Sequence, residues 1–367
     1  MKIAYFITGL GLGGAEVVTI ELANLMARRG HSVTLIYLNG ENMHTDRIDP
    51  RIRTYQLNMR KTPVGLCRSL SKARHILREF RPDVVHGHMF HANLFIRLLR
   101  MICPIPRLIC TEHSTDIESR MRMYLYRITD YLSDVNTNVS EEATRQFIEQ
   151  KAFGRQKSLT VFNGIDLIAY HQQEDPGSRA TLRKQYGIAD NDFVFLHVGR
   201  FHPAKDHRNL LEAFARITKQ VPSAKLLIVG DGELRSEIET QIEVLSLQER
   251  VVLAGVQRNV ADYYHAADCF VLSSAWEGLP MVLLEALAYG LPAVCTNVSD
   301  CAKILPADAI VPVRDSIKLA AKMLSLSRMT PVELTISGQY NRRLAERFDL
   351  NAIGTIWINL YQKDLHR

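Results

Sequence analysis

The chain has no apolar run long enough to span a bilayer, no low-complexity tract and no residue-level repeat in its 367 residues. These absences argue against transmembrane-helix, fibrous and solenoid architectures. The apolar first residues have no small-residue cleavage pattern after them, so we expect a first strand rather than a signal peptide. With 47% hydrophobic and 23% charged residues, the composition is typical of a globular protein with room for two domains.

Cysteine pairs are also missing, because the six cysteines form no Cys-x-x-Cys motif. Cys110, Cys269 and Cys295 fall in apolar runs that are typical of buried strands. Such thiols are expected to be reduced, which favours a cytoplasmic location.

Acidic residues are scarce between Arg60 and Arg107, although the whole chain carries a formal net charge of only +6. Apolar residues repeat at helical spacing from Leu66 to Phe80, which predicts a basic amphipathic helix. A basic face can bind anionic lipid headgroups at the inner face of the cytoplasmic membrane, and a solvated outer helix is the alternative. The segment has no aromatic-interleaved basic motif, so we do not expect a nucleic-acid partner.

Short apolar strands alternate with helical patterns in two consecutive sets. This alternation is typical of parallel sheets that helices cover on both faces. A polar stretch that ends near residue 190 separates the sets, so we expect domains at 1–168 and 169–348 and a terminal helix at 349–367. Ligands bind such sheets at the carboxyl ends of the strands. Strands are expected at 2–8, 32–38, 53–57, 84–88, 107–111, 135–138, 158–162, 193–198, 225–229, 251–253, 269–272, 293–295 and 310–313.

Two glutamates flank the start of a predicted helix in residues 273–290. Glu277 lies in the turn ahead of the helix and Glu285 about one turn inside it, with Pro280 expected in the first turn. A helix start offers unpaired N–H groups and a partial positive charge, which suit a phosphate. Carboxylates accept hydrogen bonds from sugar hydroxyls, so the pattern predicts a site for a sugar attached to a phosphate.

Two cations follow the first predicted strand of the second domain. Arg200 and Lys205 are separated by a turn, and side chains at this spacing can converge on one diphosphate. Arginine offers a forked contact, and lysine offers a mobile point charge.

Histidines are concentrated in the first domain. His86 and His88 share one face of a predicted strand, and His91 follows. We expect no metal site here, because no further ligand with a carboxylate at suitable spacing is evident. His113 stands in a Thr-Glu-His-Ser segment that ends another predicted strand.

These motifs together resemble the signature of retaining glycosyltransferases of family four (glycosyl transferases group 1), which have the GT-B fold. The strings that carry the resemblance are Glu-Gly-Leu-Pro followed by Met-Val-Leu-Leu-Glu-Ala, Gly-Arg-Phe-His-Pro-Ala-Lys and Thr-Glu-His-Ser. The resemblance implies two facing Rossmann-like domains with a cleft between them, and a C-terminal helix that crosses back to the first domain. It also implies transfer of a sugar from a nucleotide diphosphate, expected to be a UDP-sugar, to a hydroxyl with retained configuration and without a metal or cofactor.

The resemblance also assigns roles to residues of the second domain. Arg200, Lys205 and the backbone amides near Gly278 and Leu279 are expected to hold the diphosphate. Their cationic groups and the helix dipole would neutralise the leaving group, and hence a metal is not needed.

Four further roles follow from the same resemblance. Glu285 is expected to bind the ribose, and Glu277 to bind hydroxyls of the transferred sugar. Val256 and Gln257 are expected to contact the base through backbone atoms, and His113 to lie beside the oxocarbenium-like centre. The acceptor is expected to be a glycan, and the basic first domain favours one linked to polyprenyl diphosphate in bacterial surface polysaccharide synthesis.

A glycine loop follows the first predicted strand and leaves an alternative open. Gly9, Gly11 and Gly14 match the dinucleotide fingerprint, but the acidic ribose ligand after the second strand is absent. In the glycosyltransferase interpretation, Gly13 and Gly14 flank the diphosphate and Glu16 lies near the reacting sugars. The alternatives are an NAD-dependent oxidoreductase, which leaves Arg200 and the other second-domain motifs unexplained, and an epimerase or sugar-nucleotide-binding protein of the same fold.

Overall fold

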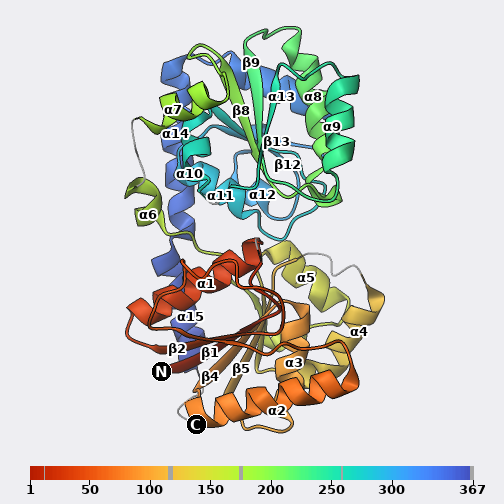
Figure 1. Ribbon diagram of the computed structural model, residues 1–367, viewed down its shortest axis with the longest axis vertical. Coiled ribbons are helices and arrows are strands. Elements are labelled where there is room, and N and C mark those ends of the chain that lie inside the picture. The colour runs from red at the N-terminus through yellow and green to blue at the C-terminus, as the bar shows by residue number, and fades with distance from the viewer. Residues whose placement is uncertain (12, 115–118, 173–176, 258, 364–367) are drawn as a thin grey trace. The chain divides into compact units, whose positions relative to one another are not determined.

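A computed structural model describes residues 1–11, 13–114, 119–172, 177–257 and 259–363 (Figure 1). The chain divides into two compact units. Unit 1 consists of Met1–Ile165 and Phe348–Arg367, and unit 2 consists of Asp166–Arg347. The junctions lie at 165–166 and 347–348, whereas the sequence predicted them at 168–169 and 348–349.

Unit 1 is built around one parallel sheet of seven strands in the order β3-β2-β1-β4-β5-β6-β7. Successive side chains of a strand point to opposite faces, so Tyr5 belongs to the core under one face and Phe6 to the core under the other. The strands are β1 (Lys2–Ile7), β2 (Ser32–Tyr37), β3 (Arg53–Gln56), β4 (Val84–His88), β5 (Arg107–Glu112), β6 (Val135–Asn138) and β7 (Ser158–Thr160). The helices are α1 (Gly14–Arg28), α2 (Pro63–Phe80), α3 (Phe90–Arg100), α4 (Arg120–Thr129), α5 (Glu141–Glu149) and the returning α15 (Leu350–Gln362).

Helix α15 returns to unit 1 and completes its core, as the sequence predicted (Figure 1). Trp357 and Tyr361 are buried in the same core as Tyr5. At the other side of the helix, the guanidinium of Arg29 donates to the carbonyl oxygen of Asn351 at 2.7 Å. Helix α14 (Pro331–Ala345) belongs to unit 2, and α15 follows it within the stretch 349–367 where the sequence predicted a terminal helix.

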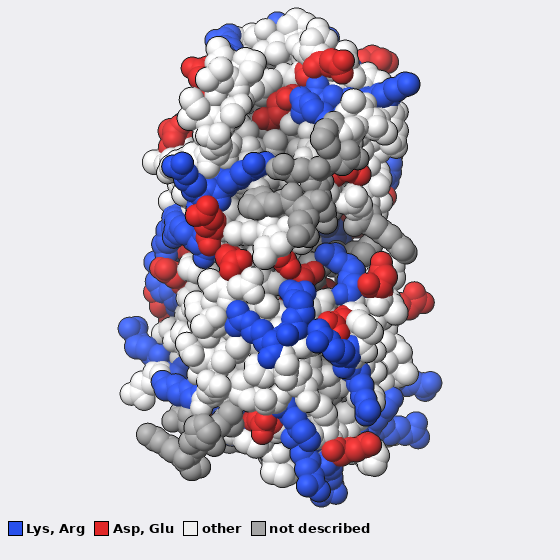
Figure 2. Space-filling model, turned by 90° about the vertical axis from the view of Figure 1, so that its left-hand side faces the viewer, with Lys and Arg blue, Asp and Glu red and all other residues white. Residues whose placement is uncertain are grey.

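Helix α2 is the basic amphipathic helix that the sequence predicted. Its residues Ala73, Ile76 and Leu77 are buried, and Arg68 and Lys72 are exposed on the opposite face. Lys and Arg side chains are also spread over the face of unit 1 in the lower half of Figure 2. Among the described residues, no helix combines the length and apolarity that crossing a membrane requires.

Unit 2 contains a second parallel sheet, of six strands in the order β10-β9-β8-β11-β12-β13. The two sheets confirm the predicted α/β class with two Rossmann-like domains. The strands are β8 (Phe193–Val198), β9 (Ala224–Val229), β10 (Val251–Gly255), β11 (Cys269–Leu272), β12 (Ala293–Thr296) and β13 (Ile310–Val311). The remaining helices are α6 (Leu167–Gln172), α7 (Ser178–Gln185), α8 (His207–Thr218), α9 (Arg235–Val244), α10 (Ala261–Ala266), α11 (Met281–Ala288), α12 (Cys301–Ile304) and α13 (Ser316–Ser327).

The polar stretch before residue 190 includes two helical segments among its described residues. It contains α6 and α7, and Arg183 of α7 is only 1% exposed. Its guanidinium forms an ion pair with Asp268 at 2.8 Å and donates to the carbonyl oxygens of Ala189, Asp190 and Asp192. Burial of a paired charge allows this polar helix to pack, which a hydrophobic pattern cannot reveal.

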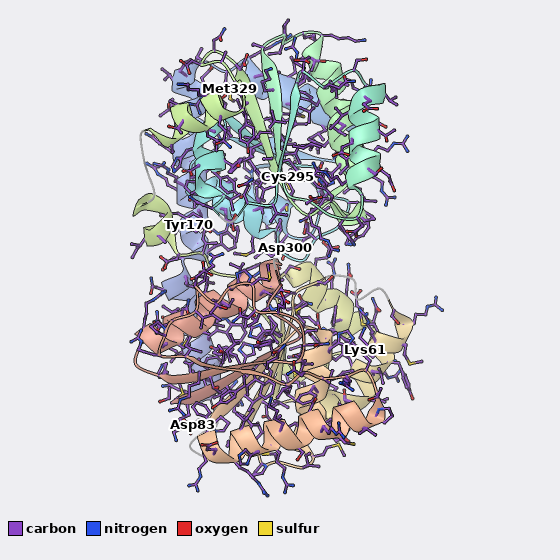
Figure 3. All side chains as sticks on the ribbon, viewed as in Figure 1. Lys61, Asp83, Tyr170, Cys295, Asp300 and Met329 are labelled. Carbon is purple, nitrogen blue, oxygen red and sulfur yellow. The ribbon has the colours of Figure 1, made fainter. Side chains whose placement is uncertain are left out.

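The cysteines are unpaired, and the three in the predicted strands are buried. Cys295 lies in β12 at the centre of unit 2 (Figure 3). Burial raises the pKa of the Cys110 thiol and that of the Cys269 thiol, so both remain protonated at neutral pH.

Candidate active site

The candidate residues of unit 2 lie where its strands end. The loops after β8 and β9 pack backbone against backbone, because a Cβ on Gly230 would lie 2.0 Å from the carbonyl oxygen of Gly199. Gly230 also has φ +136°, a conformation that L side chains rarely adopt. This contact fixes the path of the loop that carries Arg200 and leads to the short 3-10 helix Pro203–Lys205.

Lys205 and Glu277 form an ion pair at the ends of β8 and β11. The side chains are only 18% and 13% exposed, so water screens the pair weakly. Ser274 Oγ donates to the same Glu277 oxygen at 2.7 Å, and Ser273 Oγ donates to the Lys205 carbonyl oxygen at 2.8 Å. The sequence predicted separate roles for Lys205 and Glu277, and the structure places them in direct contact.

Arg200 has a different partner. Its guanidinium lies 3.1 Å from a carboxylate oxygen of Glu233, and its side chain is 71% exposed. The convergence of Arg200 and Lys205 on one point therefore stays a prediction, because each cation is paired with its own carboxylate.

The residues at the start of helix α11 form a candidate site for an anion. Pro280 is the cap residue directly before the helix, one position earlier than the first turn where the sequence placed it. Gly278 and Leu279 precede it, and the Gly278 carbonyl oxygen accepts a hydrogen bond from Ser299 Oγ. The first amides of a helix have no partner within it, so they are suited to an anion.

Glu285 lies one turn into α11 and is held by a residue that the sequence did not identify. The hydroxyl of Tyr264, on α10, donates to Glu285 Oε2 at 2.8 Å. Tyr264 is 1% exposed, and its ring stacks on that of Tyr289 with a centroid separation of 5.0 Å. Burial, followed by the Glu285 charge, raises the pKa of Tyr264 well above its ordinary value, so the tyrosine remains a donor. No local spacing connects Tyr264 with Glu285, because the two residues lie on separate helices.

The loop after β10 carries Val256 and Gln257. Val256 is exposed, and the Gln257 amide donates to the carbonyl oxygen of Ala254 at 2.6 Å. This hydrogen bond within the loop holds the Gln257 side chain in place. Contact of the loop backbone with a nucleotide base stays a prediction.

The glycine loop of unit 1 joins β1 to α1. Gly13 is the N-cap residue of α1 and Gly14 its first residue. The carboxylate of Glu16 folds back toward Gly13, where a Cβ would lie 2.3 Å from Glu16 Oε2. Burial raises the pKa of Glu16 above its ordinary value. His44 supports the loop, because its Nε2 lies 2.7 Å from the Gly11 carbonyl oxygen, a contact that sequence reasoning missed.

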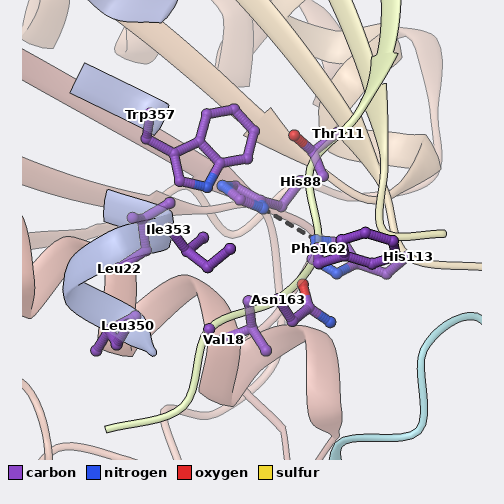
Figure 4. A pocket seen from close by; sticks show the side chains of 11 residues that line it. Val18, Leu22, His88, Thr111, His113, Phe162, Asn163, Leu350, Ile353 and Trp357 are labelled. Atoms are coloured by element: carbon purple, nitrogen blue, oxygen red, sulfur yellow. Dashed lines mark hydrogen bonds between the residues drawn. The ribbon is translucent and has the colours of Figure 1, made fainter. Parts of the chain in front are cut away.

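His113 lies just beyond β5 and lines a small pocket of unit 1 (Figure 4). Its Nε2 is 3.0 Å from Nδ1 of His88, the last residue of β4. Burial lowers the pKa of His113 to about 4, so its imidazole is neutral at pH 7. The pocket combines these polar groups with apolar side chains from α1 and α15: Val18, Leu22, Leu350, Ile353 and Trp357.

His86 and His88 do share one face of β4, as predicted, with ring centroids 4.1 Å apart. His91 does not join them, because it is exposed on α3 and its ring contacts Phe90. Within the described ranges of the chain, no group of three or more His, Cys, Asp or Glu side chains is placed to hold a metal ion.

Comparison with known protein families matches most of the chain to glycosyltransferases. Residues 12–168 match the model described as Glycosyltransferase Family 4, and residues 178–342 match the model described as Glycosyl transferases group 1.

Individual relatives agree with these models. An uncharacterized glycosyltransferase of Methanocaldococcus jannaschii is 32% identical over 253 residues, which span 64% of this chain and 60% of that protein. The UDP-Gal:alpha-D-GlcNAc-diphosphoundecaprenol alpha-1,3-galactosyltransferase of Escherichia coli is 26% identical over 301 residues, 78% of this chain and 77% of that protein. The crystal structure of Anabaena HepE in complex with UDP has the same fold, with a TM-score of 0.83 at 21% identity over 98% of this chain and 99% of that one.

Proposed function

Since this chain belongs to glycosyltransferase family 4, we propose that it transfers a sugar from a UDP-sugar to a hydroxyl of a lipid-linked glycan, with retention of the anomeric configuration.

The position of the Lys205–Glu277 pair carries this proposal. Lys205 follows β8 and Glu277 follows β11, and these neighbouring strands are where the strand order of unit 2 changes direction. Open α/β sheets bind their ligands at this switch point. A cation, a carboxylate and the amides at the start of α11 match the needs of a diphosphate joined to a sugar.

In this mechanism the groups of unit 2 hold the donor. Lys205, Arg200 and the amides near Gly278 bind the diphosphate, and their positive charge stabilises it as a leaving group. Glu277 binds sugar hydroxyls, and Glu285, fixed by Tyr264, binds the ribose. These cations replace a divalent metal, so we expect turnover in the presence of a chelator.

The chemical step takes place at the anomeric carbon. The bond between that carbon and the diphosphate oxygen breaks, and the acceptor oxygen bonds to the carbon on the same face. The acceptor proton passes to the leaving phosphate oxygen. His113, which is neutral at pH 7, directs a dipole rather than a charge toward the oxocarbenium-like centre.

A titration of candidate donors tests this function. We expect UDP-galactose or UDP-N-acetylglucosamine to raise the melting temperature and to be hydrolysed slowly, and GDP-mannose and NAD to have weaker effects. Stabilisation by NAD alone would overturn the proposal, and product with inverted configuration would remove the retaining mechanism.

A lipid-linked acceptor is supported by a relative and by the surface of α4. The Escherichia coli relative is named for a diphosphoundecaprenol-linked acceptor. Helix α4 exposes Met121, Tyr124 and Ile128 together with Arg127, and its sequence contains no acidic residue. Aromatic and apolar side chains beside arginines are typical of helices that lie in a membrane interface. We therefore propose that the enzyme acts at the inner face of the cytoplasmic membrane.

Vesicle binding tests this placement. At low salt we expect stronger binding to phosphatidylglycerol vesicles than to phosphatidylcholine vesicles, and loss of that binding in Tyr124→Ser/Ile128→Ser. Val332→Ser/Ile336→Ser, on exposed positions of α14, is the matched control. Equal binding of both lipids, or equal loss in both variants, would contradict the membrane surface on α4.

A further inference from the structure

Two neighbouring strands of unit 1 bring histidines together where they end. Strands β4 and β5 pair in parallel, with His86 opposite Ile109 and His88 opposite Thr111. Side chains that are opposite one another in a sheet share a face, and both histidines therefore point to the core that contains Trp357. The next residue on that face after Thr111 is His113, which brings its ring within reach of His88.

The contact between His88 and His113 couples their protonation patterns. Nδ1 of His88 and Nε2 of His113 are 3.0 Å apart, so one ring donates the hydrogen bond and the other accepts it. Burial keeps both rings neutral at pH 7, because it lowers both pKa values. The tautomer of one ring thereby determines the tautomer of the other. The two outer nitrogens of the pair, Nε2 of His88 and Nδ1 of His113, are buried and have no hydrogen-bond partner among the residues that the structure describes.

His88 is itself held rigidly. Its ring packs on that of His86, which is fixed at both nitrogens by the Tyr361 hydroxyl at 2.8 Å and Thr111 Oγ1 at 2.6 Å. Directly after His88, Met89 has φ +73°, which ends the strand sharply before α3 begins. Backbone in an uncommon conformation, such as the positive φ of Met89, often occurs at functional sites.

We propose that His88 is a positioning residue for the transfer reaction: its hydrogen bond fixes the ring orientation of His113 and couples the tautomers of the two rings. The inference rests on the proposed function only in that His113 acts on the donor sugar. It goes beyond that function because it assigns a role to His88. This residue ends β4, the strand beside the one that leads to His113, and is 1% exposed.

Two substitutions at His88 separate hydrogen bonding from packing. His88→Asn keeps a polar amide close to the position of Nδ1, and His88→Leu fills the space without a nitrogen. With UDP-galactose hydrolysis as the assay, we expect kcat to fall about 10- to 100-fold in His88→Leu, with donor KM changed by no more than about threefold, and to recover largely in His88→Asn.

A double-mutant cycle shows whether His88 acts through His113. In the His113→Ala background, His88→Leu should change kcat by less than about threefold, because the ring that it positions is gone. An equal loss in both backgrounds would show that His88 has only a structural role. Full activity in His113→Ala alone would instead refute the proposed part of His113 in the reaction, so the two failures are distinguishable.

Side-chain NMR tests the geometry without turnover. In protein labelled with ¹⁵N at histidine, we expect the His113 ring to show one tautomer in the wild type and in His88→Asn. In His88→Leu its two nitrogen shifts should approach each other, as the tautomers interconvert. Unchanged His113 signals in His88→Leu would overturn the proposal.

Discussion

Unit 1 and unit 2 have the same strand order around their centres, β2-β1-β4-β5 in one and β9-β8-β11-β12 in the other. Both place candidate site residues at the ends of the two strands at which the order changes direction. In unit 1 these groups are the glycine loop after β1 and His88 at the end of β4, whose neutral ring contacts His113 just beyond the neighbouring β5. In unit 2 they are charged, with Lys205 bound to Glu277. Topology thus determines where a site forms, and side chains determine whether it is neutral or ionic.

The difference has a physical basis in burial. The histidines of unit 1 are buried with other neutral groups, so desolvation favours their neutral form. In unit 2 the opposite charges of Lys205 and Glu277 offset the cost of their burial, and Ser274 adds a hydrogen bond. Desolvation therefore leaves neutral dipoles at the end of β4 in unit 1 and a pair of opposite charges at the ends of β8 and β11 in unit 2.

Removal of Lys205 should abolish the ionic character of the unit 2 site. We expect Lys205→Ala to lower kcat/KM about 1,000-fold, or about 4 kcal/mol, because the diphosphate loses a cation. Glu277 loses its cationic partner in a poorly solvated site, which should lower the free energy of unfolding by about 3 kcal/mol. Kinetics with UDP-galactose and urea unfolding measure the two effects. Lys205→Ala/Glu277→Gln should regain stability but not activity, and Lys219→Ala, at an exposed position, should change neither. Normal turnover in Lys205→Ala would show that the activity does not depend on the charged groups of unit 2.

Acid should destabilise the protein through its neutral histidines. Because the folded-state pKa values of His113 and His197 are lowered from 6.5 to about 4, the unfolded chain binds more protons between these pH values. Stability therefore falls as the pH drops from 6.5 to 4, by about 3 kcal/mol for fully buried His197.

Glu112 opposes this trend, because burial raises its pKa from 4.5 to about 7, and its protonation in the folded state adds stability as the pH drops through that range. Urea unfolding at pH 7 and pH 5 measures the sum, which we expect to be a net loss at pH 5 because His86, His88 and His207 also have lowered pKa values. A protein more stable at pH 5 than at pH 7 would contradict this prediction.

Substitution of Tyr264 tests whether its hydrogen bond positions Glu285, and the expected effect is smaller than at Lys205. Tyr264→Phe removes the hydrogen bond to Glu285, and we expect the donor KM to rise about 10-fold while kcat stays within about threefold. Tyr263→Phe, which breaks a bond to Tyr186 instead, is the matched control. An equal rise in KM in both variants would indicate a general effect on α10 rather than a role at Glu285.

The smallest effect is expected at Arg200. Its exposed pair with Glu233 contributes little to stability, so Arg200→Ala should leave unfolding unchanged. Donor binding should weaken about three- to tenfold and become less sensitive to salt, because one phosphate contact is lost. Arg208→Ala removes an equally exposed arginine of α8 and should leave binding unchanged. Isothermal titration with UDP at two salt concentrations measures the difference, and no change in Arg200→Ala would exclude Arg200 from the site.

The sequence alone determined the features that depend on local backbone geometry. Apolar periodicity located the strands of both sheets. The two-residue period of a strand was sufficient to place His86 and His88 on one face. Motif strings selected Lys205, Glu277 and His113 as candidates that follow predicted strands, and Glu285 as a candidate inside a predicted helix.

Only the tertiary structure decided which of these side chains meet. Lys205 and Glu277 are 72 positions apart, and His86 and Tyr361 are 275 apart. Such contacts depend on the order of strands in a sheet and on the return of α15 to unit 1, and no local spacing encodes either. The sequence could therefore name candidate groups for a sugar-nucleotide site, whereas folding selected the pairing of Lys205 with Glu277, since parallel strands far apart in the chain become neighbours only when the sheet is complete.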